Sequence, residues 1–313
     1  MLPVVKALMQ HWRSLNEWLK AFLLAVLLLV AMHVLVVRWV VVENTSMYAT
    51  LRPGDLMAVE RWPVWTGLER GDIVVFRDPL KDELASWRRP LMVKRIAGMP
   101  GDVVEVRAGS LLVNGIEQSA PPDGTRSYLV RLRTDASPAR VLDLLGLKGL
   151  DVMKGRQVLE LPLNEVLASQ VEALSDVVSV TPMGLATGSP RHLFPFSQRY
   201  AWNGDHYGPV RVPRQGDTLV IDPNTLPLYD RLISVYEAHR LTVNGNELML
   251  DEEPLTHYVV EKDHAFVLGD GLHHSADSRY WGFLPMDHVV GRVRWVVTGI
   301  GADGARSGPR HLQ

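Results

Sequence analysis

A single apolar segment near the N-terminus constrains this 313-residue chain more than any other feature. From Ala21 to Val37 the sequence reads AFLLAVLLLVAMHVLVV and carries no formal charge, and Val40-Val41-Val42 prolongs the apolar character. A helix rises ~1.5 Å per residue, so these residues reach about 26 to 33 Å, the thickness of the hydrocarbon core of a bilayer. The sequence therefore predicts a transmembrane anchor over residues 21–42, preceded by a short leader over residues 1–20.

The alternative is a secretory signal that is removed from the mature protein. The apolar run exceeds the usual ~7–15 residues of such signals, and no small-x-small cleavage site follows it. We therefore favour a retained anchor. Lys6, Arg13 and Lys20 precede the run while Arg38 and Arg52 follow it, and this small excess of positive charge predicts a cytoplasmic N-terminus.

Composition removes several classes of function. The chain has 33 basic and 35 acidic side chains, a formal net charge of −2, so charge-driven binding to nucleic acid is not expected. It has no cysteine, which excludes disulfides, thiolate metal sites and a cysteine nucleophile. The length suffices for one large or two modest globular units.

Short β-branched runs that follow Gly-Asp pairs dominate the chain beyond the anchor. Glycine supplies the turn, aspartate bonds nearby backbone amides, and the β-branched residues favour a strand. The four runs are RPGDLMAVE from Arg52, ERGDIVVF from Glu69, MPGDVVEV from Met99 and RQGDTLVID from Arg214. Asn114-Gly115 and Asn244-Gly245 lie between strand-like runs, and both pairs are typical of hairpin turns.

The middle of the chain differs, because apolar residues at helical spacing predict helices near 163–174 and 224–240. The last residues are rich in glycine and charge, which predicts a loose tail. The chain is thus expected to be mainly β on one membrane helix, with this division beyond the anchor: a β domain in two parts, 43–107 and 261–300, an α+β insertion over 108–260, and a flexible tail over 301–313.

Two stretches carry residues suited to a reaction with a nucleophile. ENTSMYATLRPGD places Ser46 just beyond the apolar run, near the membrane surface, although a serine before a turn most often bonds the backbone. In RRPLMVKRIAG, Lys94 shares one face of a predicted strand with apolar neighbours. Burial lowers the pKa of a lysine and makes its neutral amine available as a general base. Arg95 on the opposite face is expected to disfavour protonation of Lys94 further.

The alternative for Lys94 is a residue on an edge strand that discourages aggregation. A third stretch, HAFVLGDGLHHSADSRYWGFLP, places Ser275, Asp277 and Arg279 at every second position after Asp270. An Asp–Arg pair there can pin the loop, while Ser275 presents a hydroxyl to a nearby amine.

Together these stretches resemble the type I signal peptidase family, membrane-bound serine proteases that use a Ser–Lys dyad. The motifs occur in the family's order behind an N-terminal anchor and cover about a third of the chain. They are Ser46-Met47-x-x-Thr50-Leu51, Gly71-Asp72-Ile73-Val74-Val75-Phe76, Lys94-Arg95-x-x-Gly98-x-Pro100-Gly101-Asp102, and Gly269-Asp270 followed by Ser275-x-Asp277-Ser278-Arg279-x-Trp281-Gly282-x-x-Pro285.

The resemblance implies roles for these residues. Ser46 would be the nucleophile and Lys94 its general base, with Ser275 orienting the lysine amine. The supporting residues would be Asp277, Arg279 and Asp270. The implied fold is a signal-peptidase/LexA-like bent β-sheet whose apolar edge touches the bilayer, and no metal or cofactor is implied. The implied partners are membrane lipid and secretory preproteins with small residues at −3 and −1, cut near the export machinery on the outer face of the bacterial cytoplasmic membrane.

The chain also departs from the family pattern. Ala49 stands where proline is usual, Gly271 where asparagine is usual, and Leu272-His273-His274 replaces polar residues. Asn44 stands where the family has serine or glycine, so we expect its side-chain amide to join the Ser46 backbone amide in the oxyanion hole.

Part of the surface is also expected to bind substrate or membrane. It would comprise Met47, Trp62 and Trp65, although ordinary packing in the core or a loop is the alternative for the two tryptophans.

Three rival functions remain open from the sequence. One is a specialised relative, such as a pilin-maturing peptidase of a conjugation system with a narrow client. Another is a catalytically silent, membrane-anchored binding protein. A third is a histidine metal site, disfavoured by the lack of ligand spacing, that would draw on His257, His264, His273, His274 or His288. A LexA-type repressor should be soluble and carry a DNA-binding head, so the predicted anchor argues against it.

Overall fold

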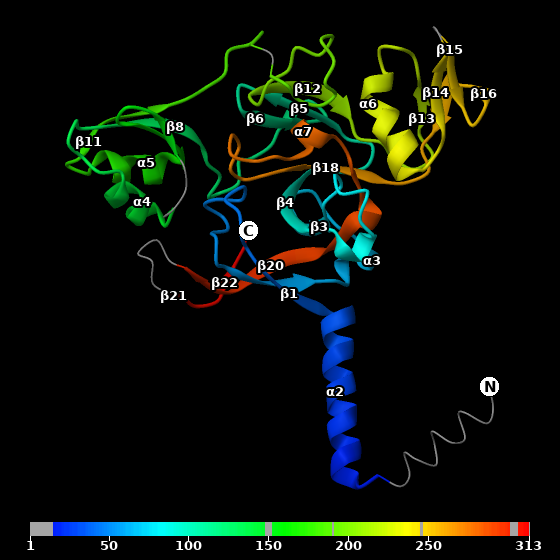
Figure 1. Ribbon diagram of the computed structural model, residues 1–313, viewed down its shortest axis with the longest axis horizontal. Helices are drawn as coiled ribbons and strands as arrows, with labels where there is room; N and C mark the ends of the chain where they lie inside the picture. Colours follow the sequence, from blue (N-terminus) through cyan, green and yellow to red (C-terminus); the bar gives the residue numbers. More distant parts are fainter. Residues whose placement is uncertain (1–14, 148–151, 190, 245–246, 301–305, 313) are drawn as a thin grey trace.

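The computed structural model describes residues 15–147, 152–189, 191–244, 247–300 and 306–312. Most of the predicted leader 1–20 and the Gly245 of the second predicted hairpin turn lie outside the described residues. The helix α2, Glu17–Leu35, projects from one side of a body built mainly of strands (Figure 1). The predicted mainly β fold is thereby confirmed.

The central sheet of the body is antiparallel and carries both predicted parts of the β domain. The order of its strands starts at β1, the strand that directly follows α2. Two short strands, β21 (Arg306–Ser307) and β22 (Arg310–His311), also pair with the long strand β20. In spatial order the strands are β1 (Val37–Val41), β2 (Leu56–Glu60), β20 (Val289–Ile300), β3 (Ile73–Arg77), β4 (Leu91–Gly98), β18 (His264–Leu268) and β19 (Leu284–Pro285).

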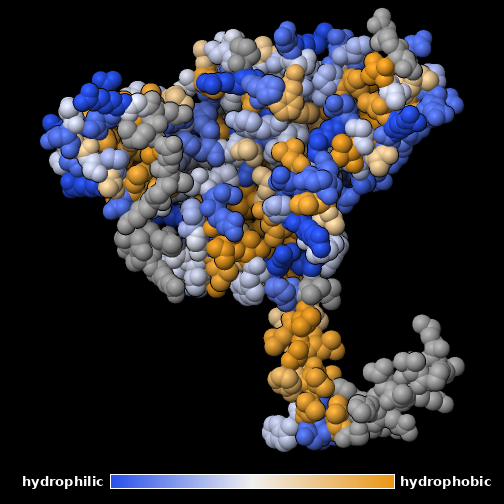
Figure 2. All heavy atoms as spheres, in the orientation of Figure 1, coloured by the Kyte–Doolittle hydropathy of each residue, from blue (hydrophilic) through white to orange (hydrophobic). Residues whose placement is uncertain are grey.

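The apolar run predicted to form one helix over residues 21–42 is divided between two elements. The helix ends at Leu35, and Val37–Val41 then pairs in register with Leu56–Glu60, so the predicted extension of the helix to residue 42 is wrong. The β-branched run forms a strand because β2 satisfies its backbone hydrogen bonds. Among the described helices, none has the length and apolarity needed to cross a membrane. The exposed surface of α2 nevertheless consists mostly of apolar side chains (Figure 2).

The described part of residues 108–260, predicted as an α+β insertion, contributes to two peripheral lobes. One lobe is a four-stranded sheet covered by two short helices, α4 (Ala139–Leu145) and α5 (Glu165–Glu172). Its strands, in spatial order, are β11 (Val177–Pro182), β8 (Arg126–Leu132), β10 (Val158–Leu163) and β9 (Met153–Gly155). We call residues 126–182 the β8 lobe.

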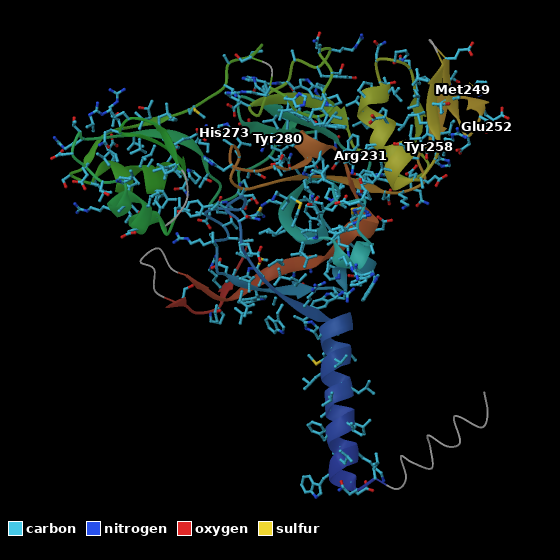
Figure 3. The ribbon with its side chains drawn as sticks, in the orientation of Figure 1. Arg231, Met249, Glu252, Tyr258, His273 and Tyr280 are labelled. Carbon is cyan, nitrogen blue, oxygen red and sulfur yellow. The ribbon has the colours of Figure 1, made fainter. Side chains whose placement is uncertain are left out.

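The second lobe reaches the opposite end of the body from the β8 lobe (Figure 1) and contributes to the largest of the apolar cores. Arg231 ties it to the body, because its guanidinium donates to the Pro79 carbonyl and to Asp82 (Figure 3). Its elements are β12 (His206–Arg211), β13 (Thr218–Val220), α6 (Leu226–Arg231), the π-helical turn η2 (Leu232–Tyr236), β14 (Leu241–Asn244), β15 (Glu247–Leu250), β16 (Glu253–Pro254) and β17 (His257–Val259). β12 joins β5 (Val103–Arg107), β6 (Ser110–Val113) and β7 (Ile116–Glu117) in a small sheet.

Local predictions in these lobes meet mixed outcomes. Asn114-Gly115 joins β6 to β7 as a hairpin, and α5 lies within the helix predicted near 163–174. The helix predicted over 224–240 is shorter, because α6 and η2 end at Tyr236. The loose tail is wrong for Arg310–His311, since Arg310 donates to the Thr50 carbonyl and to buried Asp55.

Candidate active site

Ser46 lies in a tight turn between β1 and β2. The turn is closed by backbone bonds from Tyr48 N to the Thr45 carbonyl and from Leu51 N to the Met47 carbonyl. Met47 and Leu51 pack with Val42 in the core beneath the turn, which fixes the backbone on either side of Ser46. The prediction that Met47 belongs to an exposed substrate or membrane surface is therefore wrong, since Met47 is 0% exposed.

Lys94 reaches Ser46 from the middle of β4. Its Nζ donates to Ser46 Oγ at 2.6 Å and to the Val93 carbonyl at 2.9 Å. β4 lies between β3 and β18, and Lys94 is only 3% exposed, so the edge-strand alternative does not hold. The structure thus brings together the two residues singled out as nucleophile and base.

Burial gives Lys94 an unusual protonation equilibrium. Desolvation lowers its pKa from the ordinary 10.5 to about 8, although the charges of Asp277 and Asp270 act to raise it. At pH 7 about a tenth of the Lys94 side chains are therefore neutral and able to accept a proton, against less than a thousandth for an ordinary lysine. Arg95, which was expected to lower the pKa of Lys94 further, does not contribute to this lowering. Arg95 instead forms a two-pronged ion pair with Asp270 at 2.9 and 2.7 Å.

The segment Gly269–Arg279, which we call the support loop, approaches the Ser46 turn closely. Gly271 N donates to the Ser46 carbonyl at 3.1 Å, and Thr50 Oγ1 donates to Asp270 Oδ2 at 2.6 Å. A side chain at Gly269 would overlap with Ser275 Oγ and with the Ser46 carbonyl. Glycine is thus required at position 269, because the support loop and the Ser46 turn approach each other closely there.

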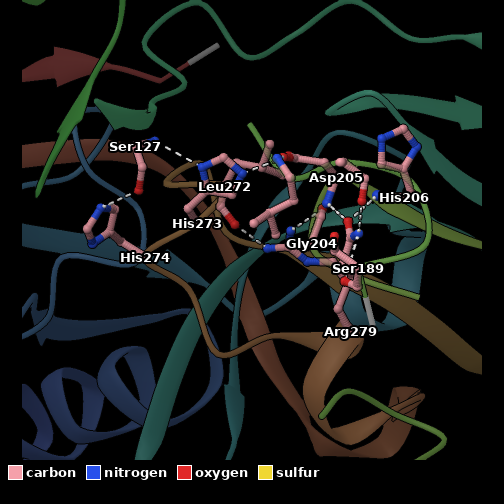
Figure 4. Close-up of polar contacts among 12 residues, drawn as sticks. Ser127, Ser189, Gly204, Asp205, His206, Leu272, His273, His274 and Arg279 are labelled. Atoms are coloured by element: carbon pink, nitrogen blue, oxygen red, sulfur yellow. Dashed lines mark hydrogen bonds and ion pairs between the residues drawn. The ribbon is translucent and has the colours of Figure 1, made fainter. Parts of the chain in front are cut away.

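Asp277 and Arg279 form the predicted pair that pins this loop. Asp277 accepts from Arg279 Nε at 2.9 Å and Nη2 at 2.8 Å, and it also accepts from Gly269 N. Arg279 donates further to the carbonyls of Gly204 and Leu272, so each nitrogen of its buried guanidinium makes at least one hydrogen bond (Figure 4). Asp277 also caps the short helix α7, Ser278–Trp281.

Ser275 does not hold the position predicted for it. It is buried against Gly269, but its Oγ has no hydrogen-bond partner among the described residues, and no bond joins it to Lys94. The lysine amine is oriented instead by Ser46 and the Val93 carbonyl.

Asn44 and the two tryptophans lie at the surface. Asn44 is exposed, and its side chain makes no hydrogen bond to another described residue. Trp62 is 39% exposed and Trp65 65% exposed, on or beside the short helix α3, Pro63–Thr66, so the core-packing alternative does not hold for Trp65. α3 lies on the side of the body from which α2 projects (Figure 1).

His273 and His274, which replace polar residues of the family pattern, link the support loop to the β8 lobe. His273 Nδ1 accepts from Ser127 N at 3.0 Å while its Nε2 lies 2.7 Å from Asp205 (Figure 4). Burial acts to raise the pKa of Asp205, but the bonds from His273 and Leu185 N lower it below its usual value. Within the described ranges, no three His, Asp or Glu side chains are placed to hold a metal ion.

The residues that sequence reasoning missed lie at this same junction. Thr125, from the turn before β8, contacts both the Ser46 turn and the support loop. Tyr48 is buried in the β8 lobe, where its hydroxyl donates to the Leu145 carbonyl. Neither residue carries a local pattern that predicts a role, because their partners are distant in sequence.

A cavity of about 430 Å³ lies beside the support loop. It is lined by Arg95, Thr125, Gly269 and Asp270, but not by Ser46 or Lys94. The cavity therefore borders the residues that support the dyad and not the dyad itself.

Comparison with known proteins decides the family. The sequence matches the model of the family described as signal peptidase, peptidase S26, over residues 15–144 and 174–298, about four fifths of the chain. This chain belongs to the signal peptidase S26 family. The resemblance drawn from the motifs is thereby confirmed, and the S26 match extends through much of 108–260. It omits 145–173, which includes all of β9, β10 and α5.

Relatives within the S26 family align over part of their length. A signal peptidase I of Bacillus licheniformis is 35% identical over 129 residues, 41% of this chain and 62% of the relative. A signal peptidase IB of Staphylococcus aureus is 34% identical over 110 residues, 35% of this chain and 53% of the relative. The matched part thus spans about half to two thirds of these relatives. The solved structure of a signal peptidase I from Enterococcus faecalis covers 72% of this chain and 96% of its own, at 18% identity and a TM-score of 0.25.

Proposed function

We propose that this protein is a membrane-anchored serine endopeptidase that removes signal peptides from secretory preproteins. Ser46 would be its nucleophile and Lys94 its general base. The observation that carries the proposal is the 2.6 Å contact between Lys94 Nζ and Ser46 Oγ, made by a buried lysine with a lowered pKa. Membership of the S26 family and the relatives named signal peptidase I support the same activity.

The proposed reaction proceeds through an acyl-enzyme. Neutral Lys94 accepts the hydroxyl proton of Ser46 as Oγ attacks the scissile carbonyl carbon, and the carbonyl oxygen takes up the negative charge. The Lys94 ammonium then gives its proton to the leaving amine as the peptide bond breaks. A water molecule, deprotonated in turn by Lys94, attacks the ester and restores the Ser46 hydroxyl.

Asp270, Asp277 and Arg279 would act through position and charge. The Asp277–Arg279 pair holds the support loop, and Asp270 fastens that loop to Thr50 in the Ser46 turn. The two carboxylates also limit how far the pKa of Lys94 falls. Ser275 would orient Lys94 only after a change from its present placement, and its buried, unbonded hydroxyl beside Gly269 is the support for that role.

Asn44 would supply the second oxyanion donor, beside the backbone amide of Ser46. Its exposed side chain lies two residues before the nucleophile and is free to turn toward bound substrate. Loss of one such donor typically costs ~3 kcal/mol of transition-state stabilisation, or about 10²-fold in rate. Asn44→Ala should therefore cleave a preprotein about 10²-fold more slowly, and an undiminished rate removes the assignment.

Attachment to the membrane would place the site beside its substrates. The exposed apolar side chains of α2 support a single-pass anchor, with the N-terminus in the cytoplasm and the body on the outer face. Trp62 and Trp65 would add an interfacial surface, as amphipathic rings favour the headgroup region. Signal peptides are themselves inserted in the membrane, so tethering both partners raises their effective concentration.

One experiment tests the activity. Detergent-solubilised wild-type protein, Ser46→Ala and Lys94→Ala are incubated with a preprotein that carries small residues at −3 and −1. Wild type should release the signal peptide and both variants should be inactive, whereas Lys81→Ala, a change of an exposed lysine, should cleave normally. Full cleavage by either dyad variant would refute the proposed mechanism.

A second candidate function is the same chemistry on a narrow set of clients. The observation that favours it is the part of the β8 lobe over 145–173 that the family model omits, since an added surface beside the site can select substrates. It predicts that wild type fails on a generic preprotein but cleaves one particular partner. No cleavage of any client would favour a silent binding protein.

A further inference from the structure

The short segment Asp123–Thr125 lies between the Ser46 turn and the support loop. Ala49 N donates to the Asp123 carbonyl at 3.3 Å, on the side of the Ser46 turn. On the other side, Thr125 and Gly271 form an isolated parallel bridge. The segment leads directly into β8, so it connects the peripheral lobe to both halves of the candidate site.

Thr125 makes the connection with three of its atoms. Its Oγ1 donates to the Tyr48 carbonyl at 2.7 Å, within the Ser46 turn. Its backbone N donates to the Asp270 carbonyl at 2.8 Å, and its own carbonyl accepts from Leu272 N at 2.8 Å. Thr125 is 4% exposed, so these bonds are protected from water.

These bonds join three segments to one another: the Ser46 turn, the support loop and Thr125. Gly271 N donates to the Ser46 carbonyl, and Thr50 Oγ1 donates to Asp270, so the Ser46 turn and the support loop also touch directly. Thr125 bonds both of these segments and so links them a further time. The backbone N and carbonyl of Thr125 both bond the support loop, so its bond to the Ser46 turn is made by the side-chain hydroxyl.

Tyr48 extends the same arrangement into the lobe. Its ring is 0% exposed in the core of the β8 lobe, and its hydroxyl donates to the Leu145 carbonyl at 2.8 Å. The Ser46 turn is therefore held at Tyr48 by two groups of residues 108–260, the Thr125 hydroxyl and the Leu145 carbonyl. The direction of Ser46 Oγ relative to Lys94 depends on this turn.

We propose that Thr125 is a positioning residue for the Ser46–Lys94 pair, acting through its hydroxyl bond to the Tyr48 carbonyl. The proposal rests on the proposed function for its catalytic consequence. Displacement of reacting atoms by about 1 Å can cost on the order of 10²-fold in rate, so the loss of this bond should act on kcat more than on KM.

The kinetic test compares Thr125→Val with Thr125→Ser. Valine keeps the branched shape but lacks the hydroxyl, and serine restores the hydroxyl. Thr125→Val should lower kcat about 10- to 100-fold with KM within about twofold of wild type, while Thr125→Ser should recover most of kcat. Thr242→Val, a half-buried change in the remote strand β14, is the matched control and should leave both constants unchanged. A kcat for Thr125→Val within threefold of wild type would overturn the proposal.

A measurement that needs no activity separates this proposal from the proposed function. Hydrogen–deuterium exchange is followed in Ser46→Ala and in Ser46→Ala/Thr125→Val. Relative to Ser46→Ala, the double variant should exchange amide hydrogens about tenfold faster in segments 46–51 and 270–275, with no change in β3 or β20. Faster exchange throughout the central sheet, or none in the two segments, would refute the positioning role. If wild type fails to cleave while the local change is observed, the proposed function fails and the positioning of the turn stands.

Discussion

The side-chain nitrogen of Lys94 lies 2.6 Å from the hydroxyl oxygen of Ser46, although the two residues are 48 positions apart in the chain. Ser46 is held in a turn above the core residues Met47 and Leu51, and Lys94 extends from the middle of the central sheet. The contact therefore depends on how the Ser46 turn packs on the core and how β4 sits in the sheet.

The pH dependence of cleavage should follow the ionisation of Lys94. A general base acts only when neutral, and burial lowers the pKa of Lys94 to about 8. We therefore expect kcat/KM to rise with pH through an apparent pKa of about 8 and to level off above it. The measurement is the rate of cleavage of a peptide without titratable groups between pH 6 and 10.

Asp277→Asn provides the control for that profile. The charge of Asp277 raises the pKa of Lys94, so its removal should shift the rising limb to lower pH. A profile that is flat between pH 6 and 10, or a shift to higher pH in Asp277→Asn, would contradict the assignment of Lys94 as the base.

Lys94→Met should abolish cleavage and yet stabilise the fold. The folded protein holds Lys94 at a pKa below its unfolded value of 10.5, so the unfolded chain binds more protons between pH 8 and 10.5. The cost of the buried charge is therefore complete below pH 8 and is relieved as the pH rises toward 10.5. Methionine avoids this cost, and we expect the free energy of unfolding at pH 7 to rise by about 1–3 kcal/mol.

Denaturant unfolding at pH 7 and pH 10 measures the effect. The gain from Lys94→Met should shrink at the higher pH, whereas Lys81→Met, at an exposed position, should change stability little at either. A loss of stability in Lys94→Met at pH 7 would show that the hydrogen bonds of the amine outweigh its desolvation.

The two glycines of the support loop should differ in their tolerance of alanine. An added Cβ at Gly269 would overlap with Ser275 Oγ and the Ser46 carbonyl, but at Gly271 the nearest atom, the Ser46 carbonyl oxygen, would be 3.3 Å away. We expect Gly269→Ala to reduce cleavage at least about 10²-fold by displacing the Ser46 turn, and Gly271→Ala to stay within about tenfold of wild type. Steady-state kinetics on both variants, with circular dichroism to verify folding, tests the difference, and equal effects would argue against close packing at Gly269.

Trp62 and Trp65 should matter only for substrates in a membrane. In liposomes, the full-length Trp62→Ala/Trp65→Ala variant should cleave an inserted preprotein about 3- to 10-fold more slowly, because its body is held less closely to the lipid surface. The same variant should cleave a short soluble peptide at the wild-type rate. Tyrosine at both positions should preserve most of the activity, and an unchanged rate on the inserted preprotein in the alanine variant would remove the interfacial role.

The parts of the site that were predictable are those in which a few adjacent residues carry the signal. Lys94 in an apolar row predicted a buried amine, and Asp277 two positions before Arg279 predicted the pair that pins the loop. The placement of Ser275 was not predictable in this way, because its hydroxyl packs against the backbone of Gly269 and makes no hydrogen bond to another described residue. The surface position predicted for Met47 was wrong for a related reason, because the turn that carries Ser46 directs the next side chain into the core.

By itself, the sequence determined the mainly β fold, the apolar N-terminal helix and the family, because strand periodicity, apolar runs and motifs are local properties of the chain. Only the tertiary structure decided that Arg95 pairs with Asp270 and that Thr125 joins the Ser46 turn to the support loop. Those contacts join residues separated by 175 and 77 positions. Their geometry depends on how sheets and loops pack, and no local pattern along the chain encodes it.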